Sequence, residues 1–324
     1  MYPLKFNKVY KERIWGGNRL GELLGGTLPG TRIGESWELC CHPNGMSVVA
    51  NGSLAGKTLA ELLIEYPYEL MGGNFRPNDR FPLLIKAIDA NDNLSVQVHP
   101  DDDYAYRGEK EAGKTEAWYV LDAKDEAKII YGLKKGVSKE DFLEAIQSNR
   151  LMESLRVVPV KKGDMIYVPA GLVHALLEGI VVYEVQQNSD TTYRVYDYGR
   201  VDKDGQAREL HLDKALDVIQ FGDQENIDFS NQEIVCPYFK MKYVRIQKHW
   251  SDHTNNDLVV YLLVAGSGEL IFQDGKKFLT RGETVLLPAS LGEMEVKGNL
   301  EILRITSFPT KPLSAASLKL SLLA

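Results

Sequence analysis

Residues 161–176 read KKGDMIYVPAGLVHAL, and residues 280–295 read TRGETVLLPASLGEME. Both stretches run from a glycine and an acidic residue through an apolar segment to a Pro-Ala pair. Each follows an apolar segment that carries a tyrosine, EAWYVL at 116–121 and LVVYLL at 258–263. A strand pattern repeated in this way predicts two copies of one β-domain.

Most of the remaining chain has the pattern of short strands separated by Gly, Asn and Asp turns, which predicts an all-β sandwich or barrel. Three stretches have a helical pattern instead, at residues 58–72, 137–149 and 210–221. Thr58 with Glu61, and Ser138 with Asp141, supply the N-terminal residues that start a helix. We therefore expect a mainly β protein of two jelly-roll barrels with a small helical accessory region.

The two copies are expected to meet in the polar stretch 221–233. We predict an N-terminal domain of residues 1–228 and a C-terminal domain of residues 229–324. When the copies are aligned from their shared glycine, His174 falls opposite Glu293. The second copy therefore keeps the strand pattern and lacks the polar residues of the first.

The composition is that of a globular protein, with 44% apolar and 26% charged residues among 324. The net charge of -7 disfavours nucleic acid and anionic membrane as partners. Three cysteines form no even disulfide framework, so reduced thiols are expected. The chain shows no apolar signal segment near its start and no run long enough to span a membrane. We expect a cytoplasmic protein.

Two polar side chains interrupt the apolar stretch LSVQVHP at residues 94–100. Strand alternation places Gln97 and His99 on the same face. An unpaired buried polar group costs about 1–3 kcal/mol, so the pair needs either mutual hydrogen bonds or a metal ion. Pro100 is expected to end the strand, and Asp101–Asp103 to form a solvated turn.

Further candidate ligands lie on other predicted strands. Glu116 begins an apolar strand two residues after Lys114, and His174 follows the turn made by Pro-Ala-Gly. Each of them alone also fits an ordinary structural role. Together, His99, Glu116 and His174 form a set of two histidines and one carboxylate, with Gln97 as a candidate fourth ligand. This donor set suits a catalytic Zn²⁺ or a non-haem Fe(II) ion, and the lack of a thiolate argues against a structural zinc site.

The polar segment SDTTYRVYDYGR at residues 189–200 carries two arginines among tyrosines. Arginine recognises phosphate through paired N–H donors, so Arg194 and Arg200 are candidates for anion binding. The alternative interpretation is a surface loop with ordinary ion pairs.

These motifs together resemble type I mannose-6-phosphate isomerase in its short bacterial form. The resemblance extends over nearly the whole chain. It rests on WGG at 15–17, GESWEL at 34–39, FPLLIKAIDA at 81–90, QVHPDD at 97–102, GKTEAWYVL at 113–121, PAGLVHAL at 169–176 and SDTTYRVYDYGR at 189–200.

The resemblance implies the cupin fold, a jelly-roll β-barrel. It also implies one zinc ion per chain, with His99, Glu116 and His174 on the family's ligand positions. Gln97 matches a fourth position, but short relatives are often described with three protein ligands. The longer members carry an extra helical domain, of which residues 58–72 and 137–149 would be the reduced form.

The resemblance further implies that Arg194 is the catalytic arginine and Lys114 an active-site lysine. We expect Lys86 and Arg200 to join them in binding the substrate, a hexose 6-phosphate. The implied reaction interconverts mannose 6-phosphate and fructose 6-phosphate through an enediolate. Two alternatives use the same residues, namely a cupin Fe(II) oxygenase and a cupin that binds sugar phosphate without turnover. The pattern does not identify the base that moves the proton.

Overall fold

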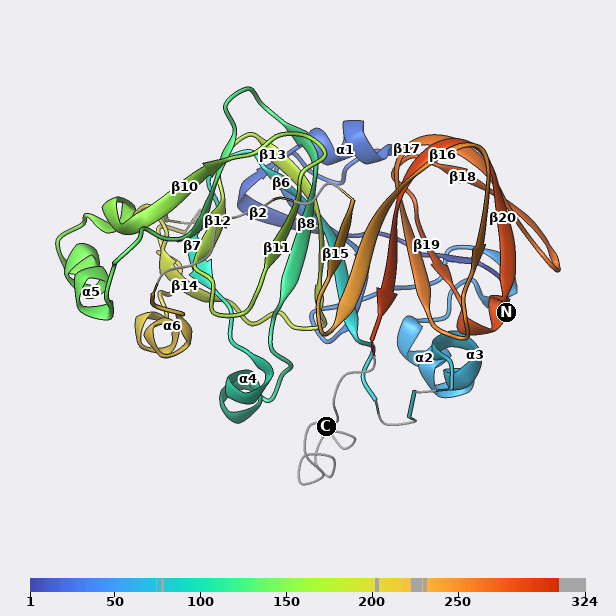
Figure 1. Ribbon diagram of the computed structural model, residues 1–324, viewed down its shortest axis with the longest axis horizontal. Coiled ribbons are helices and arrows are strands. Elements are labelled where there is room, and N and C mark those ends of the chain that lie inside the picture. Colours follow the sequence, from blue (N-terminus) through green and yellow to red (C-terminus); the bar gives the residue numbers. More distant parts are fainter. Residues whose placement is uncertain (74, 77–78, 202–203, 223–228, 230–231, 309–324) are drawn as a thin grey trace. The chain divides into compact units, whose positions relative to one another are not determined.

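The computed structural model describes residues 1–73, 75–76, 79–201, 204–222, 229 and 232–308 (Figure 1). The chain divides into two compact units. The first comprises Met1–Val9, Glu38–Leu84 and Gln232–Ala324, and the second comprises Tyr10–Trp37 and Ile85–Asn231. The predicted domains of residues 1–228 and 229–324 stay a prediction, and most of the expected junction at 221–233 lies outside the described residues.

Two sheets build most of the second unit, with the strand orders β11-β8-β13-β6-β3-β2 and β10-β9-β12-β7-β14. The first of these sheets contains β2 (Val9–Gly17), β3 (Ile33–Leu39), β6 (Leu83–Ala90), β8 (Glu116–Ala123), β11 (Met165–Val168) and β13 (Ile180–Gln187). The second contains β7 (Val96–Val98), β9 (Lys128–Leu133), β10 (Leu155–Pro159), β12 (His174–Leu176) and β14 (Tyr193–Tyr196).

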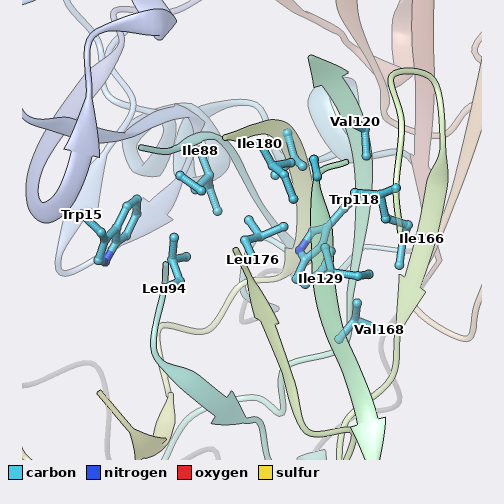
Figure 2. Close-up of a cluster of buried hydrophobic side chains, with 14 of the residues drawn as sticks. Trp15, Ile88, Leu94, Trp118, Val120, Ile129, Ile166, Val168, Leu176 and Ile180 are labelled. Carbon is cyan, nitrogen blue, oxygen red and sulfur yellow. The ribbon is translucent and has the colours of Figure 1, made fainter. Parts of the chain in front are cut away.

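An apolar core joins these two sheets. Figure 2 shows Trp118 and Ile166 from one sheet packed in a single cluster with Ile129 and Leu176 from the other. Because successive residues of a strand point to opposite faces, the next residue of β9, Ile130, belongs to a different cluster on the outer face. The second unit is therefore a sandwich with an apolar cluster between its sheets.

Helices cover the outer face of the five-stranded sheet. α5 (Lys139–Gln147) contributes Phe142, and α6 (Leu212–Val218) contributes Ala215, to the cluster that contains Ile130. The helices predicted within 137–149 and 210–221 are confirmed. Ser138 and Asp141 form the expected reciprocal cap of α5.

The helix expected at 58–72 is present as two pieces in the first unit, α2 (Leu59–Glu65) and α3 (Pro67–Met71). Thr58 and Glu61 form the predicted capping box. The break falls at Pro67, which has no N–H to donate to the preceding turn.

The prediction of a solvated turn at Asp101–Asp103 is wrong, because a helix begins there. The Asp101 side chain accepts a hydrogen bond of 2.8 Å from the Tyr104 N–H and caps α4 (Asp102–Glu109). Acidic side chains at a helix N-terminus are stabilised by the helix dipole and by free N–H groups. The remaining α-helix is α1 (Arg19–Leu24). Of the helices in the described ranges, none is long and apolar enough to cross a membrane.

The first unit contains a seven-stranded sheet of order β1-β19-β17-β20-β16-β15, with β18 paired to β17. Its strands are β1 (Leu4–Lys5), β15 (Glu233–Val235), β16 (Phe239–His253), β17 (Val259–Phe272), β18 (Gly275–Thr280), β19 (Thr284–Leu287) and β20 (Glu293–Ser307). A small hairpin of β4 (Cys41–His42) and β5 (Gly45–Met46), and 3-10 turns at Gly52–Leu54, Leu151–Ser154 and Ala289–Leu291, complete the elements.

The internal repeat is visible in the strand pairing. β11 pairs antiparallel with β8 in the second unit, and β19 pairs antiparallel with β17 in the first. The prediction of a mainly β protein with two related β-units is confirmed, although the strands form separate sheets and not closed barrels. Cys40, Cys41 and Cys236 form no disulfide, as expected.

The interior between the two sheets of the second unit should dominate its stability. Ile129 is fully buried there, whereas Ile64 on α2 is 81% exposed. We expect Ile129→Ala to lower the free energy of unfolding by about 2–5 kcal/mol, because it removes buried methyl groups and leaves a cavity. The matched Ile64→Ala should change it by less than about 0.5 kcal/mol. Chemical denaturation of both variants measures the difference, and equal values would contradict this packing.

Candidate metal centre

Strand register places a row of polar side chains at one end of the sandwich interior. Glu116 begins β8 and shares its inward face with Trp118. On the neighbouring strand β13, Gln186 lies opposite Glu116 and Glu184 lies opposite Trp118. The interior therefore changes from apolar to polar along the same strands.

The facing sheet supplies the nitrogen ligands. His174 begins β12 and lies directly opposite Gln97 of β7. The Gln97 Nε2 is 3.3 Å from the His174 Nε2. The ring of Trp118 meets the His174 ring edge-on at a centroid distance of 5.5 Å, which fixes the imidazole against the core. His99 follows the end of β7, just before Pro100.

Three of the predicted ligands converge. The Nε2 atom of His99 is 3.4 Å from one Glu116 oxygen, and the Nε2 atom of His174 is 3.3 Å from the other. Metal–ligand bonds of about 2.0–2.1 Å put tetrahedral ligand atoms about 3.3–3.4 Å apart. Among the described residues, this is the one group of three or more His, Cys, Asp or Glu side chains with ligand atoms close enough to hold an ion.

The backbone fixes which ring nitrogens face the centre. The His99 Nδ1 lies 3.1 Å from the carbonyl oxygen of Thr191, and the His174 Nδ1 lies 2.8 Å from that of Leu172. A carbonyl oxygen only accepts, so each Nδ1 must carry the proton. Each Nε2 then directs a lone pair at the centre, which is the arrangement that metal-bound histidines need.

The protonation states also fit a metal. Burial opposes ionisation of Glu116, but the nearby Lys114 ammonium outweighs it and holds the pKa of this carboxyl well below its usual range. Burial, reinforced by Lys114, lowers the pKa of His99 to about 3, so the imidazole is neutral. Both Glu116 oxygens and the His99 Nε2 are buried without a hydrogen-bond partner. A buried carboxylate and imidazole left in this state are the donors that a metal ion satisfies.

A cavity of about 380 Å³ adjoins this group within the second unit. Gln97 and Lys114 line it, and the Lys114 Nζ is 3.2 Å from a Glu116 oxygen. The charged residues that line it are Arg13, Lys86, Lys114, Arg194 and Arg208, with Glu35, Glu184 and Asp190. The cations outnumber the carboxylates, so the cavity suits an anionic ligand.

The predicted cations occupy different places. Lys86, Lys114 and Arg194 line the cavity, but Arg200 does not. The Arg200 guanidinium instead donates to a carboxylate oxygen of Asp197 at 2.6 Å and to the backbone of residue 93. The Nε of Arg194 is buried without a hydrogen-bond partner. Arg194 therefore keeps a free donor, and the predicted roles of these four residues stay predictions.

Glu184 and Glu35, two carboxylates whose charges act on Lys86, were not identified from the sequence. The Lys86 Nζ is 3.2 Å from Glu184 and donates to the Gln186 side chain at 2.8 Å. Glu35 accepts two hydrogen bonds from Arg13, at 2.9 and 3.0 Å. Glu35 lies in the apolar strand GESWEL and Glu184 in the apolar strand IVVYEVQQ. Each is on the same strand face as the residues two positions away, and this alternation is the signal that could have identified them as inward-facing carboxylates.

Glu35 and Glu184 respond differently to burial. Burial raises the pKa of Glu35, but Lys86 and Arg13 outweigh it and bring the value to about 2. Burial and the nearby Glu116 charge raise the pKa of Glu184, against the opposing effect of Lys86. The cavity therefore contains one firmly ionised carboxylate and one carboxyl that binds a proton more readily.

The first unit has a wider hollow of about 1010 Å³ at the ends of β16, β17 and β20. Its lining includes Asp252, His253, Glu293 and Glu295. Within the described part of the chain, these side chains do not form a group with ligand atoms close enough for an ion. Glu293, the residue aligned with His174 in the repeat, is exposed there.

A β-sandwich with two histidines and a carboxylate at the polar end of its interior is typical of the cupin class. Residues 230–307 match the family model described as mannose-6-phosphate isomerase, cupin domain. Residues 3–145 match that described as phosphomannose isomerase type I, catalytic domain.

Relatives match almost the whole chain. A mannose-6-phosphate isomerase of Bacillus subtilis is 42% identical, over 92% of this chain and 97% of the relative. One from Streptococcus mutans is 39% identical, over 93% and 97%. The crystal structure of a Bacillus subtilis mannose 6-phosphate isomerase superimposes with a TM-score of 0.88 at 37% identity, over 94% of this chain and 99% of that one. The chain belongs to the type I mannose-6-phosphate isomerase family and is an isomerase.

The low pKa of Glu35 makes it a source of acid sensitivity. Its pKa in the folded chain, about 2, lies below the ordinary value of 4.5. The stabilisation is therefore complete above pH 4.5 and is lost as the pH falls from 4.5 to 2, by at most about 3 kcal/mol. We expect Glu35→Gln to flatten the pH dependence of unfolding in this window. Denaturant titrations between pH 2 and 6 measure it, with exposed Glu140→Gln as the control, and an unchanged slope would contradict the ion pair.

Proposed function

We propose that this chain interconverts mannose 6-phosphate and fructose 6-phosphate and uses one zinc ion per chain. The observation that carries the proposal is the buried group of His99, Glu116 and His174 beside a cavity rich in cations. Family membership supports the reaction class, and the donor set supports zinc. When bound, zinc supplies Lewis acidity that polarises the sugar oxygens.

The cavity residues have separate roles in this proposal. Arg194 and Lys114 stabilise the negative charge that develops as the enediolate forms, because preorganised cations in a site with little water act strongly on such charge. Lys114 also keeps Glu116 ionised, so its charge serves the metal site as well as the substrate. Lys86 is held between carboxylates and provides a fixed cation for the phosphate or the sugar hydroxyls.

Two carboxyl groups of the cavity can move the proton between C1 and C2. Glu184 has a raised pKa and Asp190 lines the same space, whereas Glu116 is engaged with the histidines. A general base works best when its pKa approaches the working pH, which favours Glu184.

The cavity charge separates this proposal from the alternatives. The same two histidines and one carboxylate would also bind Fe(II) in an oxygenase. The cavity lining has five cations against three carboxylates, and this excess of positive charge suits a sugar phosphate but is not required by an oxygenase. Iron with oxygen uptake would favour the oxygenase, and binding of mannose 6-phosphate without turnover would favour a sensor.

The ligand set is tested by removing single histidines. We expect His99→Ala and His174→Ala to fold, to lose the one zinc ion per chain and to lose isomerisation, because each removes a ligand that no other described side chain replaces. Metal analysis and a coupled fructose 6-phosphate assay on the same samples measure both properties. The matched control is His249→Ala, which alters a half-exposed histidine of the first unit. Stoichiometric zinc in both variants would show that the ligand set is wrong.

Arg194 is tested by kinetics at full metal occupancy. We expect Arg194→Ala to keep its fold and zinc but to lower kcat/KM about 10²–10³-fold, as removal of a charge-stabilising donor does. Arg150→Ala, which removes an exposed arginine paired with Glu144 and Glu153, should leave kcat/KM unchanged. Wild-type kinetics in the Arg194 variant would remove this residue from the mechanism.

A further inference from the structure

We propose that Glu111 is a positioning residue for the metal centre, although it touches neither the ligand atoms nor the cavity. It holds the loop of residues 189–191 by one carboxylate oxygen, and this loop carries the carbonyl that orients His99. The proposal rests on the metal centre proposed above, and no motif of the sequence pointed to Glu111.

One oxygen of Glu111 gathers three donors of this loop. The Glu111 Oε2 accepts hydrogen bonds from the Ser189 hydroxyl at 3.2 Å, the Asp190 N–H at 3.2 Å and the Thr191 hydroxyl at 3.1 Å. Glu111 is only partly buried, and hydrogen bonds to an ionised acceptor are roughly twice as strong as neutral ones. A single carboxylate therefore fixes three consecutive residues.

The loop held by Glu111 contacts both the ligand His99 and the cavity. The carbonyl oxygen of Thr191 accepts a hydrogen bond from the His99 Nδ1–H at 3.1 Å, which fixes the tautomer that exposes the Nε2 lone pair. Asp190 and Thr192 line the cavity. A shift of this loop would thus alter the His99 ring and the cavity wall together.

The segment that carries Glu111 is itself held in place by hydrogen bonds to the start of α4. The Asp102 Oδ1 at the start of α4 accepts from the Gly113 N–H at 2.8 Å and from the Gln187 side chain at 2.9 Å. Lys110 ends α4 in the left-handed region, with φ of 61°, and turns the chain toward Glu111. The acidic residues after His99 therefore start α4, and the end of α4 places Glu111 beside residues 189–191.

The opposite side of the loop is held by Gln186. Its side-chain nitrogen donates to the carbonyl oxygens of Gln187, at 2.9 Å, and Ser189, at 2.5 Å. Gln186 in turn accepts from Lys86 of the cavity. Glu111 and Gln186 therefore both hold this segment, Gln186 through its backbone carbonyls and Glu111 through two hydroxyls and one N–H.

The decisive experiment measures the His99 tautomer in the metal-free protein. The chain has six histidines, so ¹H–¹⁵N spectra of their ring nitrogens can be assigned. We expect His99 and His174 both to show the Nδ1-protonated form in wild type. In Glu111→Ala, His99 should shift toward a mixture of tautomers, whereas His174, which is held by the Leu172 carbonyl, should not change. Because this measurement uses no metal, it decides the proposal even if wild type proves not to bind zinc or not to isomerise sugars.

Zinc affinity provides the functional measurement. Residues that orient metal ligands typically contribute 10- to 100-fold to affinity, and we expect Glu111→Ala to weaken zinc binding about 10-fold in competition with a chelating dye. Glu111→Gln keeps one carbonyl oxygen that can accept hydrogen bonds from the same donors, but it lacks the charge. Its zinc affinity should therefore fall between those of wild type and Glu111→Ala. Asp103→Ala is the control, because it removes an exposed acid of the same helix that contacts neither the loop nor the site.

An unchanged His99 tautomer in folded Glu111→Ala would overturn the proposal, whatever its zinc affinity. If that variant does not fold, Glu111→Gln decides: wild-type values of both properties contradict the clamp, and a partial shift of both supports it. Equal loss of zinc in Asp103→Ala would also overturn it, since the effect would then belong to α4 in general.

Discussion

The ionised carboxylate of Glu116, buried between the imidazoles of His99 and His174, is the constraint on which the site depends. Moving a charge out of water is costly unless it is paired. Lys114 provides one partner at 3.2 Å, and His99 and His174 aim their Nε2 atoms at its two oxygens. In this state neither oxygen of Glu116 has a hydrogen bond. A divalent cation at this point would coordinate the Glu116 oxygens and would thereby replace the hydrogen bonds that they lack.

The fold supplies this arrangement through strand alternation and register. Residues at alternate positions of β8, β13 and β6 face the interior, so one strand contributes apolar side chains to the core and polar ones to the site. His174 reaches the centre because β12 pairs with β7 directly opposite Gln97. The apolar core around Trp118 fixes the strands, and the strands fix the distances between the ligand atoms. Stability and function therefore share the same interior.

Local patterns were enough to predict the mainly β class, the caps at Thr58 and Ser138, and the ligand candidates. These features depend on neighbouring residues, whose spacing is visible in the chain. Glu35 and Arg13, by contrast, meet only after β2 and β3 pair, and Glu111 meets the loop at 189–191 only in the folded sandwich. Arg200 looked equivalent to Arg194 in sequence, but its side chain is bound to Asp197. The contacts of Glu35 and Glu111 join residues far apart in the chain and have no local signal, whereas Arg200 and Asp197 are only three residues apart.

The central claim is that a single zinc ion held by Glu116 and its two histidines makes this chain a sugar-phosphate isomerase. The most direct measurement is a zinc titration of the metal-free protein, with bound zinc per chain and conversion of mannose 6-phosphate recorded on the same sample. We predict a rate that rises in proportion to bound zinc and stops rising at one ion per chain. Full turnover in protein that has been stripped of metal would contradict the account.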